Sequence, residues 1–120
     1  MDKMYGKRMG YFGGADREID LKDNHVLEAK VPKRDKPGEY EASDLDLNQF
    51  IGNKDGKFEW NGSNYAETAK DLKVDGYGNT LRLRGSLRNM KGEYVPADIR
   101  LGERVGIRDY KLEYPYYSEL

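Results

Sequence analysis

The sequence predicts an all-β protein with short helical turns, built from two tandem repeats. Apolar and polar residues alternate over residues 26–31 and 80–84, which is typical of half-buried strands. No segment has the periodicity of a long amphipathic helix. The third observation is internal similarity, because residues 11–60 align with residues 65–114 without a gap. Such a repeat predicts two similar supersecondary units related by a pseudo-twofold axis.

Identical residues recur along the whole alignment. The longest shared string is Gly38-Glu39-Tyr40, which matches Gly92-Glu93-Tyr94. Further matched pairs are Tyr11 with Tyr65, Leu27 with Leu81, Arg34 with Arg88, Leu47 with Leu101, Gly52 with Gly106 and Asp55 with Asp109. One register therefore relates the two halves in this alignment.

Turn residues separate the predicted strands. Residues 36–38 and 91–92 contain Pro or Gly and predict equivalent connections. Residues 53–56 predict a hairpin turn, because Asp-Gly suits positions with positive φ. Tyr110 aligns with Gly56, and a positive φ there would cost about 1–2 kcal/mol, so we expect a differently shaped turn. Residues 45–51 predict a short helical turn with one apolar face.

Composition excludes several function classes. The chain has 21 basic and 22 acidic residues and a pI near 5.9, without the basic stripe of a nucleic-acid reader. No apolar stretch approaches the roughly 20 residues of a membrane span. The basic residues near the start are not followed by an apolar run of signal-peptide length. We therefore expect a cytoplasmic protein with no nucleic-acid and no membrane partner.

Catalytic and metal sites are also disfavoured. The absence of cysteine excludes disulfides, thiolate metal sites and a cysteine nucleophile. His25 is the single histidine, so histidine triads and histidine metal clusters are excluded. Asp44, Asp46, Asp55 and Glu59 suggest a glycosidase pair only weakly, because such residues abound on exposed strands and turns. We predict no enzyme activity, no metal and no cofactor.

Motifs in the middle of the chain resemble a known family. Residues 45–48 read Leu-Asp-Leu-Asn, and residues 51–56 read Ile-x-Asn-x-Asp-Gly before the aromatic residue Trp60. Residues 63–68, Ser-Asn-Tyr-Ala-Glu-Thr, follow directly. This order resembles the cyanovirin-N homology (CVNH) family, in particular its cysteine-free fungal members. The places of the four family cysteines hold Asp16, Val31, Ala69 and Gly85.

The resemblance implies a cyanovirin-N-like fold of two intertwined pseudo-domains. One would combine roughly residues 9–50 with 104–115, and the other roughly residues 51–103. The single domain would span 9–115, with repeats at about 11–60 and 65–114 and tails at 1–8 and 116–120. Asn61-Gly62 stands at the hinge, where the founding member has a proline, and a glycine hinge is looser. We expect a monomer, with a domain-swapped dimer as the alternative.

The same resemblance implies a lectin for Manα1-2Man-type ends of mannose-rich glycans, acting without calcium. Its central site would consist of Asn53, Asp55, Ser63, Asn64, Thr68, Ser86, Leu87, Arg88 and Met90. Amides and hydroxyls suit a saccharide, because each can both donate and accept hydrogen bonds. A second site would use Tyr11, Gly14, Arg34, Arg108 and Asp109. We expect it to be weak, because Ile107 replaces the match of Asn53 and glycines replace other polar matches.

Two alternatives remain open at the level of sequence. Residues 53–56 could be only a turn, and Trp60 is expected to pack between the pseudo-domains rather than stack on sugar. The protein could also be a CVNH domain that has lost sugar binding and serves as a protein-interaction module. The absent secretion signal and the tyrosine-rich residues 114–117 favour that alternative.

Overall fold

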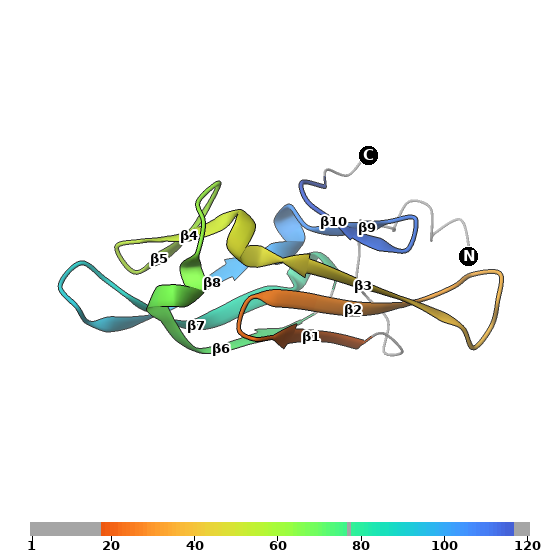
Figure 1. The fold of residues 1–120 in the computed structure, drawn as a ribbon, viewed down its shortest axis with the longest axis horizontal. Coiled ribbons are helices and arrows are strands. Elements are labelled where there is room, and N and C mark those ends of the chain that lie inside the picture. The colour runs from red at the N-terminus through yellow and green to blue at the C-terminus, as the bar shows by residue number, and fades with distance from the viewer. Residues whose placement is uncertain (1–17, 77, 117–120) are drawn as a thin grey trace.

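Two three-stranded antiparallel sheets and two β-hairpins form the protein (Figure 1). The computed structural model describes residues 18–76 and 78–116. The elements are β1 (Glu18–Lys22), β2 (Val26–Pro32), β3 (Tyr40–Asp46), η2 (Leu47–Gln49), β4 (Ile51–Lys54), β5 (Lys57–Trp60), η3 (Tyr65–Thr68), β6 (Ala69–Asp75), η4 (Gly78–Thr80), β7 (Arg82–Arg88), β8 (Tyr94–Arg100), η5 (Leu101–Glu103), β9 (Gly106–Arg108) and β10 (Lys111–Glu113). The η elements are single 3₁₀ turns, so the predicted all-β class with short helical turns is confirmed.

Each sheet is covered by the hairpin of the other repeat. Hairpin β9–β10 lies beside β3, and the Leu112 N–H donates to Ser43 Oγ at 2.9 Å (Figure 1). Hairpin β4–β5 packs on β8, where Gly56 approaches the Val95 side chain. We call β1–β2–β3 with β9–β10 the terminal lobe, and β6–β7–β8 with β4–β5 the central lobe. The predicted intertwined arrangement of two repeats is confirmed.

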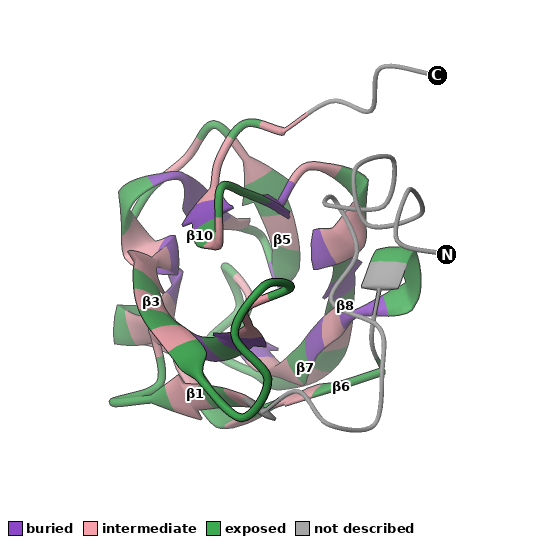
Figure 2. Cartoon of the chain, turned by 90° about the vertical axis from the view of Figure 1, so that its right-hand side faces the viewer, coloured by how far each residue is buried: buried purple, intermediate pink, exposed green. Residues whose placement is uncertain are grey.

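Both repeats contribute to one hydrophobic core. Its buried residues, coloured purple in Figure 2, are distributed over strands of both sheets and over the hairpins. The residues with at most 1% exposure include Leu27, Leu47, Ile51, Tyr65, Leu81, Leu83, Leu101, Val105 and Ile107. Because the core joins the two lobes, neither lobe buries its apolar face alone. Trp60 belongs to the aromatic layer at this junction, with its ring 5.7 Å from that of Tyr114, as predicted.

The ungapped alignment is wrong for one strand of each repeat. Leu27 pairs with Leu45, whereas Leu83, not Leu81, pairs with the equivalent Ile99. At the far end, Pro32 pairs with Tyr40 and Arg88 pairs with Tyr94. The structural counterpart of Arg88 is therefore Pro32, not Arg34. The connection after β2 spans residues 33–39 and the one after β7 only residues 89–93, and this length difference shifts the register.

The two hairpin turns have the same shape, against the sequence expectation. Asp55 and Gly56 have φ values of 50° and 88°, and Asp109 and Tyr110 have 54° and 66°. Both are two-residue turns with positive φ at both positions, the type I′ geometry. Tyr110 compensates for its unfavourable backbone, because it packs on the core and its hydroxyl accepts the Arg34 N–H at 3.1 Å. Tertiary packing therefore overrides the local preference for glycine.

The hinge between the repeats is closely packed rather than loose. A Cβ built on Gly62 would lie 2.9 Å from both the Cα and the N of Gly52. Asn61, at φ 67°, donates its N–H to the Phe50 carbonyl at 2.8 Å. Glycine stands at residues 52 and 62 because two backbones touch there, and the expectation of a looser hinge is wrong for the folded monomer.

Candidate functional site

Asn53 fastens hairpin β4–β5 to the rest of the central lobe. Its Nδ2 donates to Thr68 Oγ1 at 2.8 Å and to the Arg88 carbonyl oxygen at 2.9 Å. Its Oδ1 accepts the Gly56 N–H at 2.8 Å. This half-buried amide thus uses both of its donor hydrogens and one acceptor position inside the protein. Strand β4, helix η3 and the end of β7 meet at a single side chain.

A second bond joins the two turns at this end of the molecule. Asp55 Oδ1 accepts the Met90 N–H at 2.9 Å. Asn89 Oδ1 shapes the β7–β8 turn by accepting the N–H groups of Lys91 and Glu93 at 2.9 and 3.0 Å. The Met90 side chain is 88% exposed beside this contact. The structure therefore brings together the side chains of Asn53, Asp55 and Thr68 with the main chain of Arg88 and Met90.

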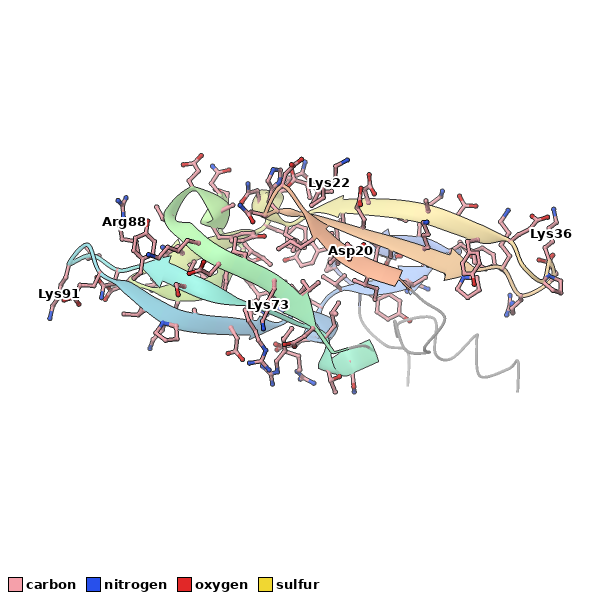
Figure 3. The ribbon with its side chains drawn as sticks, turned by 90° about the horizontal axis from the view of Figure 1, so that it is seen from below. Asp20, Lys22, Lys36, Lys73, Arg88 and Lys91 are labelled. Carbon is pink, nitrogen blue, oxygen red and sulfur yellow. The ribbon has the colours of Figure 1, made fainter. Side chains whose placement is uncertain are left out.

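Ser63 and Asn64, in the segment that leads into η3, and Arg88, at the end of β7, are exposed. Asn64 has φ 58°, and its N–H donates to the Asn48 carbonyl at 2.8 Å, which fixes the segment leading into η3. In the described ranges, 18–76 and 78–116, none of these three side chains makes a hydrogen bond or ion pair. Figure 3 shows Arg88 pointing outward at the same end as Lys91. Their polar groups are accessible to a ligand.

The prediction that the Leu87 side chain belongs to the sugar site is wrong. That side chain is fully buried, at 0% exposure, because β7 alternates and places residues 83 and 87 on the inner face. A side chain so placed cannot contact a sugar at the surface. Ser86 lies on the outer face between Lys70 and Pro96, on the same side of the strand as Arg88. The alternation of Arg82–Arg88 is a sequence signal that could have excluded Leu87.

An open hollow lies along hairpin β4–β5. It has a volume of about 410 Å³ and is lined by Lys54, Asp55, Lys57, Phe58 and Glu59. Asp55 thus stands between this hollow and the turn of β7–β8. The hollow adds charged groups and one aromatic ring to the surroundings of the predicted site.

The second predicted site is built differently. Tyr11 and Gly14 lie outside the described residues. Ile107, at the place of Asn53, is 1% exposed and belongs to the core, so no amide fastens this hairpin. Arg108 Nε donates to Glu113 Oε1 at 2.9 Å, and the Arg34 N–H donates to the Tyr110 hydroxyl. Asp109 has nearly the same φ as Asp55, 54° against 50°, but it lies beside the core residue Ile107 rather than beside an asparagine.

One titratable group beneath the central site is perturbed. Burial raises the pKa of the Tyr65 phenol, and the Asp46 carboxylate raises it further. The Tyr65 hydroxyl donates to the Asn24 carbonyl at 2.6 Å, so the neutral phenol is satisfied inside the core. Across the described residues, no three His, Asp or Glu side chains cluster as metal ligands would. The same residues contain no helix with the length and apolar character that a bilayer span requires.

Two residues at this end were missed at the sequence level. Tyr94 is 43% exposed and pairs with Arg88 across the sheet, and Lys70 Nζ lies 4.3 Å from its ring centroid. The alternation of Arg82, Arg84 and Arg88 on β7 was a signal for a cationic outer face. The correct partners of that face depend on the registers of β6 and β8, which the sequence alone did not provide.

Comparison with known proteins gives consistent matches. The family profile described as "CVNH domain" matches residues 12–113. A cyanovirin-N homolog from Neurospora crassa is 37% identical over 94 residues, which is 75% of this chain and 83% of that protein. The NMR structure of a Gibberella zeae CVNH protein superposes with a TM-score of 0.68 at 36% identity, covering 82% of this chain and 92% of that one. Microvirin, solved as a mannobiose complex, gives 0.67 at 30% identity, covering 81% and 91%.

Proposed function

Because the chain belongs to the CVNH family, we propose that it is a lectin that binds mannose-rich glycans at their Manα1-2Man-type ends. Support comes from microvirin, a structural relative solved with mannobiose. The observation that carries the proposal is the fastening of hairpin β4–β5 by Asn53 to Thr68 and the Arg88 carbonyl, with exposed polar side chains on the connected segments at Asp55, Ser63, Asn64 and Arg88. The protein would hold the sugar without changing it chemically.

The side chains of the central site divide into two roles. Asp55 can accept hydrogen bonds from sugar hydroxyls, Arg88 can donate with its planar fork, and Asn64 and Ser63 can do both. Asn53 and Thr68 are already bonded to each other at 2.8 Å, so we assign them a positioning role. A turn that is fixed before the ligand arrives loses less conformational entropy on binding.

We propose that the central site is the working one. At the other hairpin the amide is replaced by the buried Ile107, and the turn is fastened by Tyr110, whose hydroxyl accepts the Arg34 N–H. A single site gives no avidity on a multivalent glycan unless two chains associate. The monomer would therefore bind glycans without crosslinking them.

An NMR titration with Manα1-2Man mannobiose tests the proposal. We expect amide shifts at Asp55, Ser63, Asn64 and Arg88, with an affinity of about −5 to −8 kcal/mol, because a neutral ligand adds no strong Coulomb attraction. Removal of calcium with a chelator should leave the shifts unchanged.

A matched pair of variants locates the site. Arg88→Ala should weaken mannobiose binding at least about fivefold, the loss of one charge-assisted hydrogen bond. Arg34→Ala, at an exposed arginine of the other lobe, should leave the affinity unchanged. Silence at millimolar mannobiose would favour a protein-interaction module, and release of mannose from an oligomannose would contradict a purely binding role.

A further inference from the structure

The outer faces of the two sheets carry opposite charge. Row by row, Asp20, Glu28 and Asp44 are register neighbours across the terminal lobe. The corresponding row of the central lobe consists of Lys73, Arg84 and Asp98. The net charge of −1 therefore hides a separation of charge between the lobes.

Cations dominate the outer face of β6–β7–β8, which we call the basic face. Two carboxylates of this face are engaged by arginines, since Asp75 lies 2.8 Å from Arg84 and Asp98 lies 3.2 Å from Arg82. The cations of the basic face are Lys70, Lys73, Arg82, Arg84, Arg88 and Arg100. Among the described residues, Lys70, Lys73 and Arg88 have no carboxylate partner. This leaves a positive surplus that the fold does not neutralise.

The placement of these cations is costly to the fold. Lys73 lies directly opposite Arg84, and Arg82 directly opposite Arg100, although like charges in cross-strand pairs are destabilising. An anionic ligand on this face would relieve that repulsion. Lysine and arginine on an exposed sheet face are well suited to phosphate, which both recognise strongly.

The basic face is continuous with the candidate sugar site. The two meet at Arg88, whose carbonyl accepts the Asn53 amide while its side chain stands on the outer face. Lys70 is opposite Ser86, two residues along β7 from Arg88, a spacing of about 7 Å. The exposed Tyr94 ring lies beside both, 4.3 Å from Lys70 Nζ. Figure 3 shows Arg88 at the end of the molecule and Lys73 further toward its middle.

We propose that the central lobe selects mannose-rich glycans that carry phosphate. Neutral mannose would occupy the site at Asp55, Asn64 and Arg88, and the phosphate of the same glycan would meet Lys70 and Lys73. A single-stranded nucleic acid fits less well, because such ligands stack on several aromatic rings and, among the described residues of this face, Tyr94 is the exposed aromatic. The acidic face of the terminal lobe would also repel a long polyanion.

The phosphate preference rests on the proposed function. Calorimetry with two sugars tests the preference separately from mannose binding itself. The probes are Manα1-2Man and the same disaccharide with a phosphate monoester at C6 of one mannose. At low salt we expect the phosphorylated sugar to bind about five- to tenfold more tightly. At about 0.5 M salt, where screening is strong, the difference should fall below about twofold.

Two double variants with equal change of charge provide the control. Lys70→Gln with Lys73→Gln should abolish the preference for the phosphorylated sugar and leave neutral mannobiose affinity unchanged. Lys22→Gln with Lys36→Gln removes the same charge from the terminal lobe and should keep the preference. Lys22 and Lys36 lie away from Arg88 and Lys91 in Figure 3.

Each failure has a distinct signature. Absence of binding by neutral mannobiose contradicts the proposed function. Equal affinity for the two sugars, or equal loss in both double variants, overturns the phosphate preference alone. Inorganic phosphate or a short single-stranded oligonucleotide binding as tightly as the phosphorylated sugar would also overturn it, because the face would then bind anions without reference to the sugar.

Discussion

Asn53 shows how a polar side chain near a binding site can serve the fold. Sequence reasoning assigned its amide to sugar hydroxyls, but its bonds to Thr68, Arg88 and Gly56 already occupy it. Ile107 occupies the position equivalent to Asn53 in the second repeat, and its hairpin therefore lacks these hydrogen bonds. The identity of residue 53 therefore decides how the hairpin is held, and through that how Asp55 is presented.

Replacing Asn53 should affect stability before it affects recognition. Asn53→Ala removes three hydrogen bonds at a half-buried position, so we expect a loss of about 1–3 kcal/mol in the free energy of unfolding. Urea denaturation checks this, with Lys54→Ala on the same hairpin as the exposed control. A variant as stable as the control would show that the hairpin is held mainly by packing.

Tyr65 gives the protein an alkaline limit. Burial raises the pKa of its phenol, so the folded state holds the proton more tightly than the unfolded chain does. The stability that results is present below the ordinary pKa of about 10 and is lost as the pH rises toward the folded-state pKa. Above about pH 10, this residue should lower the free energy of unfolding by about 1.4 kcal/mol per pH unit.

Tyr65→Phe should remove that part of the alkaline slope. At neutral pH it should cost about 1 kcal/mol, because the Asn24 carbonyl loses its donor. Urea midpoints between about pH 9 and 11 measure both effects. Tyr94→Phe, which removes the hydroxyl of an exposed tyrosine, is the matched control. An unchanged slope in Tyr65→Phe would place the loss on other groups.

At the scale of elements, the hairpin turns decide how each lobe closes. Gly56 combines a φ of 88° with a position where a Cβ would lie 2.7 Å from Val95 Cγ2. Gly38 has nearly the same φ, 86°, but nothing lies within 4 Å of a Cβ there. These two glycines separate the backbone cost of a side chain from its steric cost.

Gly56→Ala should therefore destabilise more than Gly38→Ala. The left-handed backbone costs about 1–2 kcal/mol in either variant, and overpacking against β8 adds about 1–3 kcal/mol in Gly56→Ala alone. Thermal or urea unfolding of the two variants measures the difference. Equal losses would mean that hairpin β4–β5 moves away from β8 at little cost.

Local patterns predicted individual elements better than the relation between them. The alternation of residues 26–31 predicted strand β2, and Asp55-Gly56 predicted the turn between β4 and β5. Both signals lie in adjacent residues. The ungapped alignment placed β7 two residues away from its true register. That register depends on the length of the β7–β8 loop, residues 89–93, and shows only in the pairing of β7 with β8. The turn at Tyr110 was predicted wrongly, because its compensation comes from Arg34, distant in sequence.

The candidate site was predicted as a neighbourhood rather than as a set of roles. The family resemblance implied that Asn53 and Arg88 share a site, and the structure joins the Asn53 amide to the main-chain carbonyl of Arg88, whereas the Arg88 side chain stands on the outer face of β7. The burial of Leu87 and the engagement of Asn53 depend on strand orientation and on partners across the sheet. Contact of the remaining residues with sugar stays a prediction.

At the scale of the whole molecule, the repeats are linked through one crowded point. Hairpin β4–β5 belongs to the first repeat but lies on the sheet of the second. The chain passes between them at Asn61-Gly62, where Gly62 touches the Gly52 backbone. Tyr114, from the end of the chain, donates its hydroxyl to Asn61 Oδ1 at 3.3 Å. The closed arrangement of the single chain thus depends on a backbone contact that only glycine allows.

Gly62→Ala should shift the protein from monomer toward a domain-swapped dimer. A Cβ 2.9 Å from the Gly52 backbone strains the closed hinge, whereas two chains that exchange halves can straighten it and keep every lobe intact. Gly52→Ala, whose Cβ would lie 3.0 Å from the Ser63 nitrogen, should act in the same direction from the other side. Analytical ultracentrifugation over a concentration series measures the dimer, and Ser63→Ala is the control that leaves the contact unchanged. A Gly62→Ala protein that stays monomeric and merely unfolds more easily would show that the hinge relaxes locally, and that a glycine here protects stability rather than the oligomeric state.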